Sequence, residues 1–281
     1  MYNSKITGLG YFVPENVVTN DDLKQWMDTS DEWIQERTGI KERRWIDPAT
    51  GETTSTMAAK AAKIAIERAN LTKDDIDFIV FATLSPDMYF PGGGVRVQDM
   101  LDMPTIGALD VRNQCSGFIY SLSVADQFIK TGMYKNILVI GAENHSGGLE
   151  RSTRGRNVTV IFGDGAGGVL LEPNNEGNGI VDSILKADGA GKEFLIQKAG
   201  GSAHPVTEEN IGTPETFVYQ EGRTVFKFAV TNMADVSAEI MEKNNLKSED
   251  IDWLVPHQAN LRIIDATANR MGLTKEKVMI N

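Results

Sequence analysis

The sequence is poor in cysteine and has no long apolar run. It holds a single cysteine, Cys115, among 281 residues, which excludes an internal disulfide framework and is typical of a reducing compartment. No apolar run approaches the roughly 20 residues that a helix needs to cross a bilayer. The first residues lead directly into strand-like sequence, so we expect no signal peptide. We therefore expect a cytoplasmic protein with no membrane partner.

An excess of positive charge is also missing. Lysine and arginine total 28 against 39 aspartate and glutamate residues, a net charge of −11, which disfavours nucleic acid as a partner. An acidic partner would need a local basic cluster. The one cysteine and three histidines have no metal-ligand spacing, so we expect no structural metal. The remaining composition is that of a globular protein long enough to bury one large core or two smaller ones.

An internal repeat organises the chain. Residues 71–80 read LTKDDIDFIV, and residues 246–255 read LKSEDIDWLV. An amphipathic helix pattern precedes each stretch, over 55–70 and 228–245, and a loop and a second helix pattern follow each. This order is typical of β-α-β units with parallel strands. We predict an α/β fold of two related halves with the active site between them.

Glycine-rich segments mark the boundaries of this arrangement. Residues 173–179 predict a hinge, which divides the chain into halves 1–173 and 174–281. The glycine cluster at 163–168 lacks the Lys-Ser/Thr ending of a phosphate-binding loop. We expect it to allow close approach of two chain segments or to form a tight bend. Residues 188–212 are polar and predict a long surface excursion.

The second half is shorter than the first when the repeat is followed to its end. In the first half the strand after the second helix leads to the loop that holds Cys115. In the second half the corresponding strand begins at 278–280, and the sequence ends at Asn281. We expect the second half to lack a unit of roughly 30 residues or more, in a truncated record or a truncated protein.

Cys115 is a candidate nucleophile because of its surroundings. It lies in DVRNQCSGF at 110–118, between a strand-like run (105–111) and a helix-like run (119–129). A sulfur at the first turn of a helix faces free N–H groups that favour the thiolate. Unrelated hydrolases present a nucleophilic serine on the same kind of turn. The alternative is a buried cysteine that packs as a small hydrophobe, and the local pattern leaves both open.

The histidines differ in their promise as catalytic partners. His257 directly follows the strand-like residues 253–255, and open parallel sheets bind ligands at the carboxyl ends of strands. Cys115 and His257 are therefore predicted to face one cleft, and a neutral imidazole with a thiolate is a recognised nucleophilic pairing. His145 also follows a strand pattern but is the weaker candidate. His204 lies in a Gly/Ser/Pro-rich stretch and is expected on a solvated loop.

Four longer motifs resemble those of the β-ketoacyl-acyl carrier protein synthase III family. They are DTSDEWI at 28–34, RTGI at 37–40, FGDGAG at 162–167 and VPHQANLRI at 255–263. The resemblance extends along the chain without a large gap. It implies a thiolase-like, duplicated αβαβα fold with two pseudo-symmetric halves, in agreement with the repeat, and it implies a homodimer.

The resemblance implies a decarboxylating condensation that initiates fatty acid synthesis. Cys115 would take an acyl group from acyl-CoA as a thioester, and malonyl on acyl carrier protein would lose CO2 and attack it. His257 would hydrogen-bond the malonyl thioester oxygen as the enolate forms. No cofactor is implied, since acyl-CoA is a substrate. The family's catalytic asparagine, in a Gly-Asn-Thr motif, and a glycine-rich oxyanion loop are not found here, and Asn281 is not that asparagine.

The resemblance also implies residues that bind CoA. Trp33 matches an adenine-stacking tryptophan, and Arg37 matches a contact to a CoA phosphate. Either Arg154 or Arg156 matches the arginine on the other side of the adenine, and Arg156 is preferred. The matches to the pantetheine tunnel are Gly222, Phe226 and Asn260. Without the resemblance, a core-packed tryptophan and exposed arginines would be the default interpretation.

Two further contacts are implied for protein partners. Acyl carrier proteins are acidic, so docking on an acidic chain needs a local basic cluster. By family position its members are Lys227, Arg262 and Arg270, and the two arginines are eight apart on one predicted helix, so both can share a face. Phe90 resembles the residue that reaches toward the partner subunit's acyl pocket.

The residues beside the cysteine depart from the family pattern. Arg112, Asn113 and Gln114 stand where small residues, often alanines, are usual, and Ser116 replaces an alanine. This leaves the primer open between acetyl, branched and longer acyl groups. It also leaves open a related condensing enzyme or acyltransferase of specialised metabolism. A different reading, supported by the missing asparagine, is a non-catalytic homologue that binds acyl groups or carrier protein.

Overall fold

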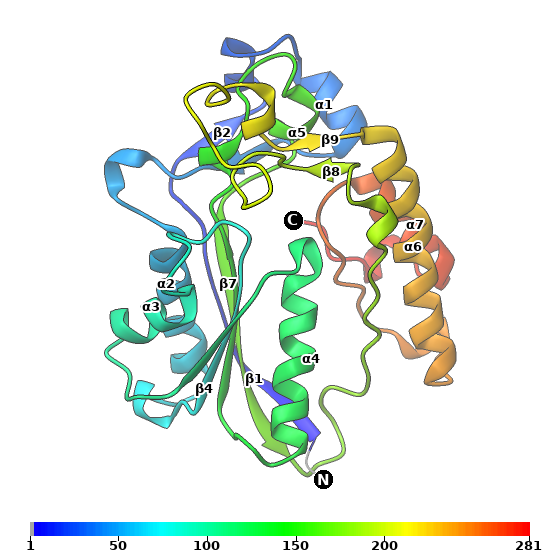
Figure 1. Cartoon of the computed structure of the whole chain (residues 1–281). Coiled ribbons are helices and arrows are strands. Elements are labelled where there is room, and N and C mark those ends of the chain that lie inside the picture. Colours follow the sequence, from blue (N-terminus) through cyan, green and yellow to red (C-terminus); the bar gives the residue numbers. More distant parts are fainter. Residues whose placement is uncertain (1–2) are drawn as a thin grey trace. The chain divides into compact units, whose positions relative to one another are not determined.

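The computed structural model describes residues 3–281, and its chain forms two compact units (Figure 1). The first unit comprises Met1–Val17, Arg44–His145 and Gly163–Ser183, and the second comprises Val18–Arg43, Ser146–Phe162 and Ile184–Asn281. Contacts thus divide the chain differently from the repeat, and the halves 1–173 and 174–281 remain a prediction. Within the described residues, no helix combines the length and apolar character needed to cross a membrane.

The first unit contains a five-stranded mixed sheet of order β1-β7-β6-β4-β5. Its strands are β1 (Asn3–Phe12), β4 (Phe78–Ala82), β5 (Gly107–Val111), β6 (Ile137–Glu143) and β7 (Gly165–Asn174). β4 is parallel to β5 and β6, whereas β7 is antiparallel to β6 and β1. The prediction of parallel strands is therefore wrong for β7. The chain re-enters this unit at Gly163, and β7 begins at Gly165, opposite Glu143 where β6 ends, so β7 must run back.

Helices cover both faces of this sheet (Figure 1). They are α2 (Thr54–Arg68), α3 (Gly93–Met100) and α4 (Gly117–Lys130). Side chains of a strand alternate between faces, so Ile79 and Phe81 of β4 pack with α2, while Phe78 and Val80 pack with α4. All five residues of β4 are buried because both faces are covered.

The glycine cluster at 163–168 lies at the start of β7. A side chain on Gly165 would approach the Phe12 carbonyl oxygen to 3.3 Å, and one on Gly168 would approach the Val139 carbonyl oxygen to 3.4 Å. These two glycines therefore let β7 lie close to its neighbours on both sides. The prediction of a close approach is confirmed at these positions.

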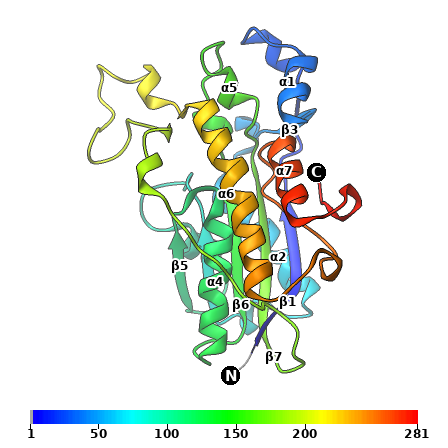
Figure 2. The same ribbon diagram turned by 90° about the vertical axis from the view of Figure 1, so that its right-hand side faces the viewer.

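The second unit is dominated by two helices that pack along each other (Figure 2). Its helices are α1 (Asp31–Thr38), α5 (Arg156–Thr159), α6 (Gly222–Lys243) and α7 (Leu261–Met271). β8 (Leu195–Ile196) and β9 (Tyr219–Gln220) form an antiparallel pair. The short strands β2 (Val17–Thr19) and β3 (Glu42–Arg44) lie where the chain passes from one unit to the other. α6 begins six residues before the predicted start at 228.

The predicted strand at 253–255 is reduced to one bridge. Leu254 pairs in parallel with Val278, while Trp253 and Val255 are 60% and 67% exposed. A strand is stabilised by pairing and by side-chain packing on its faces, and these two side chains have little of that packing. The prediction of a full strand is therefore wrong, although the parallel direction is confirmed.

Candidate active site

Cys115 lies on a turn between a strand and a helix, as the sequence predicts. β5 ends at Val111, a 3-10 turn spans Gln114–Ser116, and α4 starts at Gly117. Gln114 has a left-handed φ of 43°, a conformation that is costly for a residue other than glycine and is found preferentially at functional sites. Cys115 itself is exposed. The turn thus presents a reachable thiol just beyond the end of β5.

The ionisation of Cys115 differs from the prediction. Packing of protein around the sulfur raises the pKa of the Cys115 thiol, and the charge of Glu143 raises it further, although the backbone N–H of Cys115 opposes them. The residue as a whole keeps an exposed surface, so the thiol stays accessible while the thiolate is poorly solvated. The backbone N–H at the helix start favours the thiolate, as expected, but removal of water outweighs it, so the net shift of the pKa is upward.

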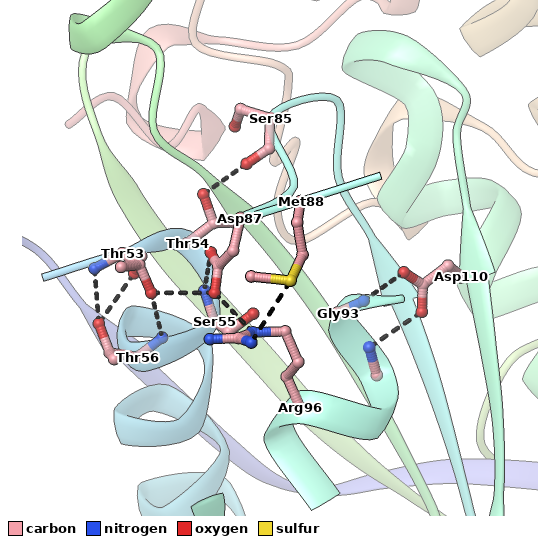
Figure 3. A network of polar contacts seen from close by, with 11 residues as sticks. Thr53, Thr54, Ser55, Thr56, Ser85, Asp87, Met88, Gly93, Arg96 and Asp110 are labelled. Atoms are coloured by element: carbon pink, nitrogen blue, oxygen red, sulfur yellow. Dashed lines mark hydrogen bonds and ion pairs between the residues drawn. The ribbon is translucent and has the colours of Figure 1, made fainter. Parts of the chain in front are cut away.

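Phe90 lies on the segment that joins β4 to α3. Asp87, on the same segment, holds it in place (Figure 3). The Asp87 carboxylate accepts hydrogen bonds from Arg96 Nε (2.8 Å), the Thr53 hydroxyl (3.1 Å) and the Ser55 N–H (3.1 Å). The Asp87 side chain is 5% exposed, whereas Phe90 is 85% exposed. The base of the segment is therefore held by α2 and α3, and the aromatic ring is left outside the core.

Asp110 fixes β5 to the start of α3, also visible in Figure 3. Its carboxylate accepts the backbone N–H groups of Gly93 and Gly94, the latter at 2.9 Å. An acidic group at a helix start satisfies free N–H groups and complements the helix dipole. This contact orients the strand that leads to Cys115.

His257 lies in the second unit, between Leu254 and α7. Part of its surface is exposed, yet packing around the ring lowers the pKa of the His257 imidazole. The neutral ring is therefore favoured near pH 7, and a neutral imidazole carries one N–H donor and one acceptor. A side chain in this state can hydrogen-bond an oxygen that gains negative charge.

The other two histidines have separate surroundings. His145 Nε2 lies 3.8 Å from Glu143 Oε2 at the exit of β6. His204 bonds Glu215 at 2.8 Å and is exposed on a loop, as predicted. That loop borders an open surface hollow of about 640 Å³ with Glu209 and Asn210 on its lining. None of the residues implied by the family resemblance lines this hollow, so its size is no argument for the chemistry.

Trp33 is flanked by two arginines in the second unit. The Arg37 guanidinium carbon lies 4.4 Å from the centre of the Trp33 ring, and that of Arg156 lies 4.3 Å from it. Arg156 also donates to the Asp28 carbonyl. Indole and guanidinium planes can both stack on an aromatic ring, and guanidinium also binds phosphate. A planar ring could enter between Trp33 and Arg156 only if the guanidinium moved away.

The choice between Arg154 and Arg156 has a geometric answer. Arg154 Nε donates to Glu150 Oε1 at 2.8 Å, and its side chain is 57% exposed. Arg156, rather than Arg154, is the neighbour of Trp33. The preference for Arg156 from the sequence therefore agrees with this arrangement, and its role in binding stays a prediction.

The residues matched to the pantetheine tunnel gather around α6 and α7. Asn260 is the N-cap of α7, where its Oδ1 accepts the Arg262 N–H (2.9 Å) and its Nδ2 donates to the Arg37 carbonyl (2.7 Å). The Arg262 guanidinium carbon lies 4.8 Å from the centre of the Phe226 ring. Gly222 is the first residue of α6, and a side chain there would meet open space. Asn260 thus links the α1 and α7 sides of this cluster.

The predicted basic cluster lies on the same two helices. Lys227 is exposed on α6, and Arg262 and Arg270 are exposed on α7. Arg270 Nε lies 3.6 Å from Asp235, which reduces the net positive charge around it. Lys227 is the sequence neighbour of Phe226, which Arg262 covers. Arg270 therefore adds less positive charge to the cluster than Lys227 and Arg262 do.

Sequence reasoning missed Asp87 and Glu143. Glu143 is the last residue of β6, and an acidic residue at the carboxyl end of a parallel strand was the available signal. Asp87 had no such signal because its partners lie up to 34 residues away in sequence. Among residues 3–281, no cluster of three or more His, Cys, Asp or Glu side chains is suited to a metal ion.

The chain is similar to one group of known proteins throughout its length. Models described as 3-oxoacyl-[acyl-carrier-protein (ACP)] synthase III match residues 109–189, and the C-terminal model of the same name matches residues 241–281. It is 46% identical to a β-ketoacyl-[acyl-carrier-protein] synthase III of Chlorobium luteolum, over 99% of this chain and 84% of the relative.

Solved structures give the same result. The 3-oxoacyl-[acyl-carrier-protein] synthase III of Aquifex aeolicus VF5 has a TM-score of 0.88 at 42% identity, covering 99% of this chain and 84% of that one. A priming β-ketosynthase from the R1128 polyketide biosynthetic pathway has a TM-score of 0.89 at 30% identity, covering 99% of this chain and 80% of that one.

Proposed function

Because this chain belongs to the 3-oxoacyl-[acyl-carrier-protein] synthase III family and has its α/β, thiolase-like fold, we propose that it condenses an acyl-CoA primer with malonyl-acyl carrier protein. The products are 3-oxoacyl-acyl carrier protein, CO2 and CoA, and the step initiates fatty acid synthesis. The observation that carries the proposal is the position of Cys115. It lies on the strand–turn–helix between β5 and α4, inside the matched residues 109–189.

Cys115 is the proposed nucleophile in the first half-reaction. Its sulfur loses a proton and attacks the carbonyl carbon of acyl-CoA, so a C–S bond to Cys115 forms. The C–S bond to CoA breaks, and the CoA sulfur leaves with the electron pair and takes up a proton. The thiol is the resting form, because burial raises the pKa of Cys115.

His257 is proposed to act in the second half-reaction. The malonyl carbon–carboxylate bond breaks, CO2 leaves, and the electron pair forms an enolate of the remaining thioester. The His257 N–H donates to the thioester oxygen, where this charge collects. With its pKa lowered, the ring is neutral near pH 7 and keeps the one N–H donor that this role needs. The enolate carbon then attacks the acyl group, and Cys115 leaves as a thiolate.

The second unit is proposed to bind CoA and the pantetheine arm. Trp33 would stack on the adenine, with Arg156 on its other face after the guanidinium moves aside, and Arg37 would contact a phosphate. Support comes from the short distances between the Trp33 ring and both guanidinium groups. The pantetheine arm would pass the remaining matched residues, which are Gly222, Phe226 and Asn260.

The proposed partners follow from the same family positions. Acyl carrier protein would dock on Lys227, Arg262 and Arg270, whose exposure supports that use. The chain would act as a homodimer, with the exposed Phe90 ring contributing to the partner's acyl pocket. The chemistry needs no resident metal or organic cofactor, and the cytoplasm is the proposed location.

A second candidate is the priming condensation of a specialised pathway. The priming β-ketosynthase of polyketide synthesis matches this chain over 99% of its residues. The bulky polar Arg112, Asn113 and Gln114 beside the nucleophile also favour an unusual primer. The two candidates share their mechanism and differ in the acyl group that Cys115 accepts.

The test separates the two half-reactions. Acyl-CoA of several chain lengths and malonyl-acyl carrier protein are supplied, and the 3-oxoacyl product is quantified for the unmodified protein and variants. Cys115→Ala should abolish product formation. His257→Ala should lower it by about 100-fold or more while the acyl group still reaches the enzyme. His204→Ala, on a solvated loop, is the matched control and should retain activity.

The control outcomes define the alternatives. Product formation that survives in Cys115→Ala would overturn the proposed nucleophile. The non-catalytic binding homologue would be supported by two results together. The folded protein would make no product with any primer, and the unmodified protein and Cys115→Ala would bind carrier protein equally well.

A further inference from the structure

The three parallel strands of the first unit have their carboxyl ends side by side at the same end of the sheet. Ala82 of β4 lies opposite Val111 of β5 and opposite Gly141 of β6. Cys115 follows β5 at this edge, and Glu143 is the last residue of β6. The exits of the three strands therefore bring together segments that are far apart in the sequence.

The first turn of α4 packs directly on these strand ends. A side chain on Gly117 would lie 3.3 Å from the Ala82 methyl group, and one on Gly141 would lie 3.4 Å from the Phe118 ring. The turn that holds Cys115 immediately precedes these two contacts. It is therefore seated over the exits of β4 and β6, with little space between helix and sheet.

Glu143 joins the exit of β6 to the exit of β4. Its Oε1 accepts the Leu84 N–H at 2.8 Å, and its Oε2 accepts the Ser85 N–H at 3.1 Å, the Ser85 hydroxyl and, more weakly, the Thr83 hydroxyl at 3.4 Å. The Ser85 oxygen in turn accepts the Asn144 N–H at 2.8 Å. Hydrogen bonds to a charged acceptor are the stronger kind. The carboxylate thus holds the polypeptide that runs beside the nucleophile turn.

We propose that Glu143 is a positioning residue for Cys115: its carboxylate anchors the exit of β4 beside the nucleophile turn, and its negative charge acts on the thiol. This proposal rests on the proposed function, in which Cys115 accepts the acyl group. Glu143 touches no reacting atom in that mechanism. It acts through the segment it holds and through its charge.

The charge has a definite consequence for the resting thiol. A carboxylate near a sulfur disfavours the thiolate, and Glu143 contributes to the raised pKa of Cys115 after the larger effect of burial. Other charged or titratable groups nearby are His145, 3.8 Å from Glu143, and Arg112, which is exposed on the Cys115 loop. The thiolate is the form that alkylating agents attack, so removal of the Glu143 charge should speed alkylation of Cys115.

The test uses the fact that Cys115 is the only cysteine of the chain. The rate of alkylation by iodoacetamide is measured from pH 6 to 10 in the absence of substrate. This rate therefore reports on Glu143 even if acyl-CoA is not a substrate of this protein. Glu143→Gln should alkylate about three- to tenfold faster at pH 7.5, with its midpoint at lower pH. Glu172→Gln is the matched control, since Glu172 lies on β7 at the opposite end of the sheet, and should leave the profile unchanged.

Further variants separate charge from anchoring. Ser85→Ala removes a hydrogen bond to Glu143 and keeps the charge, so its alkylation rate should stay within about twofold of the unmodified protein. Folding of each variant is checked by circular dichroism. Should Glu143→Gln not fold, Glu143→Asp withdraws the charge by one methylene and should alkylate about twofold faster. An unchanged profile in the folded Glu143 variant would overturn the proposal. An equal effect of Ser85→Ala would overturn the role of the charge, because anchoring alone would then account for the change.

Discussion

Residues 71–80 and 246–255 are identical at five of ten positions and have the same local backbone at their start, but they differ in the structure they join. Asn70 and Asn245, which precede them, both have left-handed φ angles, 59° and 54°. Leu71 N–H donates to a carbonyl five residues back, and so does Leu246 N–H, at 3.2 and 2.8 Å. The helix end and the turn are therefore the same in both copies.

The strand that follows is where the copies part. Phe78 and Val80 are 9% and 0% exposed, whereas their counterparts Trp253 and Val255 are 60% and 67% exposed. β4 has a paired neighbour on each side and helices on both faces. Leu254 has the single bridge to Val278. Helix ends and turns are decided by residues close in the sequence, whereas a strand depends on the strands that pair with it and the helices that cover its faces.

The largest expected effect is the difference in the free energy of unfolding between two valine-to-alanine substitutions. Val80→Ala removes two buried methyl groups and leaves a cavity, so it should lower the free energy of unfolding by about 2–3 kcal/mol. Val255→Ala removes the same groups from an exposed position and should cost less than about 0.5 kcal/mol. Urea unfolding of both variants measures the difference. Equal losses would mean that the two strands have the same surroundings.

A smaller test addresses what the copies share. Asn70→Ala and Asn245→Ala each force an alanine into a left-handed conformation, which should cost about 1 kcal/mol at both sites. Asn70→Gly and Asn245→Gly are the controls and should be tolerated, since glycine adopts this conformation freely. The same urea measurement applies. A cost found at one asparagine alone would contradict the equivalence of the two helix ends.

The smallest effect concerns the acidic turn and its pH dependence. The Thr72 hydroxyl and N–H hydrogen-bond Asp75 and lower the pKa of its carboxyl. A lowered pKa in the folded state stabilises the protein above the unfolded pKa of about 4, and this is lost as the pH falls through the folded pKa.

Thermal unfolding between pH 6 and pH 2 checks this sign. Asp75→Asn should melt about 1–2 °C below the unmodified protein at pH 6, and the difference should vanish at the acidic end. In the second copy Lys247 supplies the N–H but no hydroxyl to Asp250, so Lys247→Thr should raise the melting temperature by about 1 °C. A difference for Asp75→Asn that persists at pH 2 would show that the charge is not responsible.

Elements decided by local sequence could be predicted. The helices α2 and α4 begin and end within about two residues of the helix patterns predicted at 55–70 and 119–129. The start of α6 was missed because Glu221 caps it, accepting the Thr224 N–H at 2.9 Å, a signal overlooked in the sequence. The strand at 253–255 could not be assessed locally, since its apolar residues match those of β4.

The candidate site divides in the same way. The position of Cys115 at a strand–turn–helix followed from nearby residues. The direction of its pKa did not, because it depends on packing and on Glu143, 28 residues further along the chain. The neighbours of Trp33 include Arg156, which is more than 100 residues away, and only the family resemblance pointed to it. Contacts distant in sequence are thus what local reasoning could not supply.

The most direct test of the central claim is the intact mass of the purified protein after incubation with acetyl-CoA and with longer acyl-CoAs. We predict a gain of one acyl group, absent in Cys115→Ala, and the acyl-CoA that gives it identifies the primer. A folded protein that gains no mass with any acyl-CoA, or a Cys115→Ala variant that still gains it, would contradict the assignment of Cys115 as the acyl-accepting nucleophile.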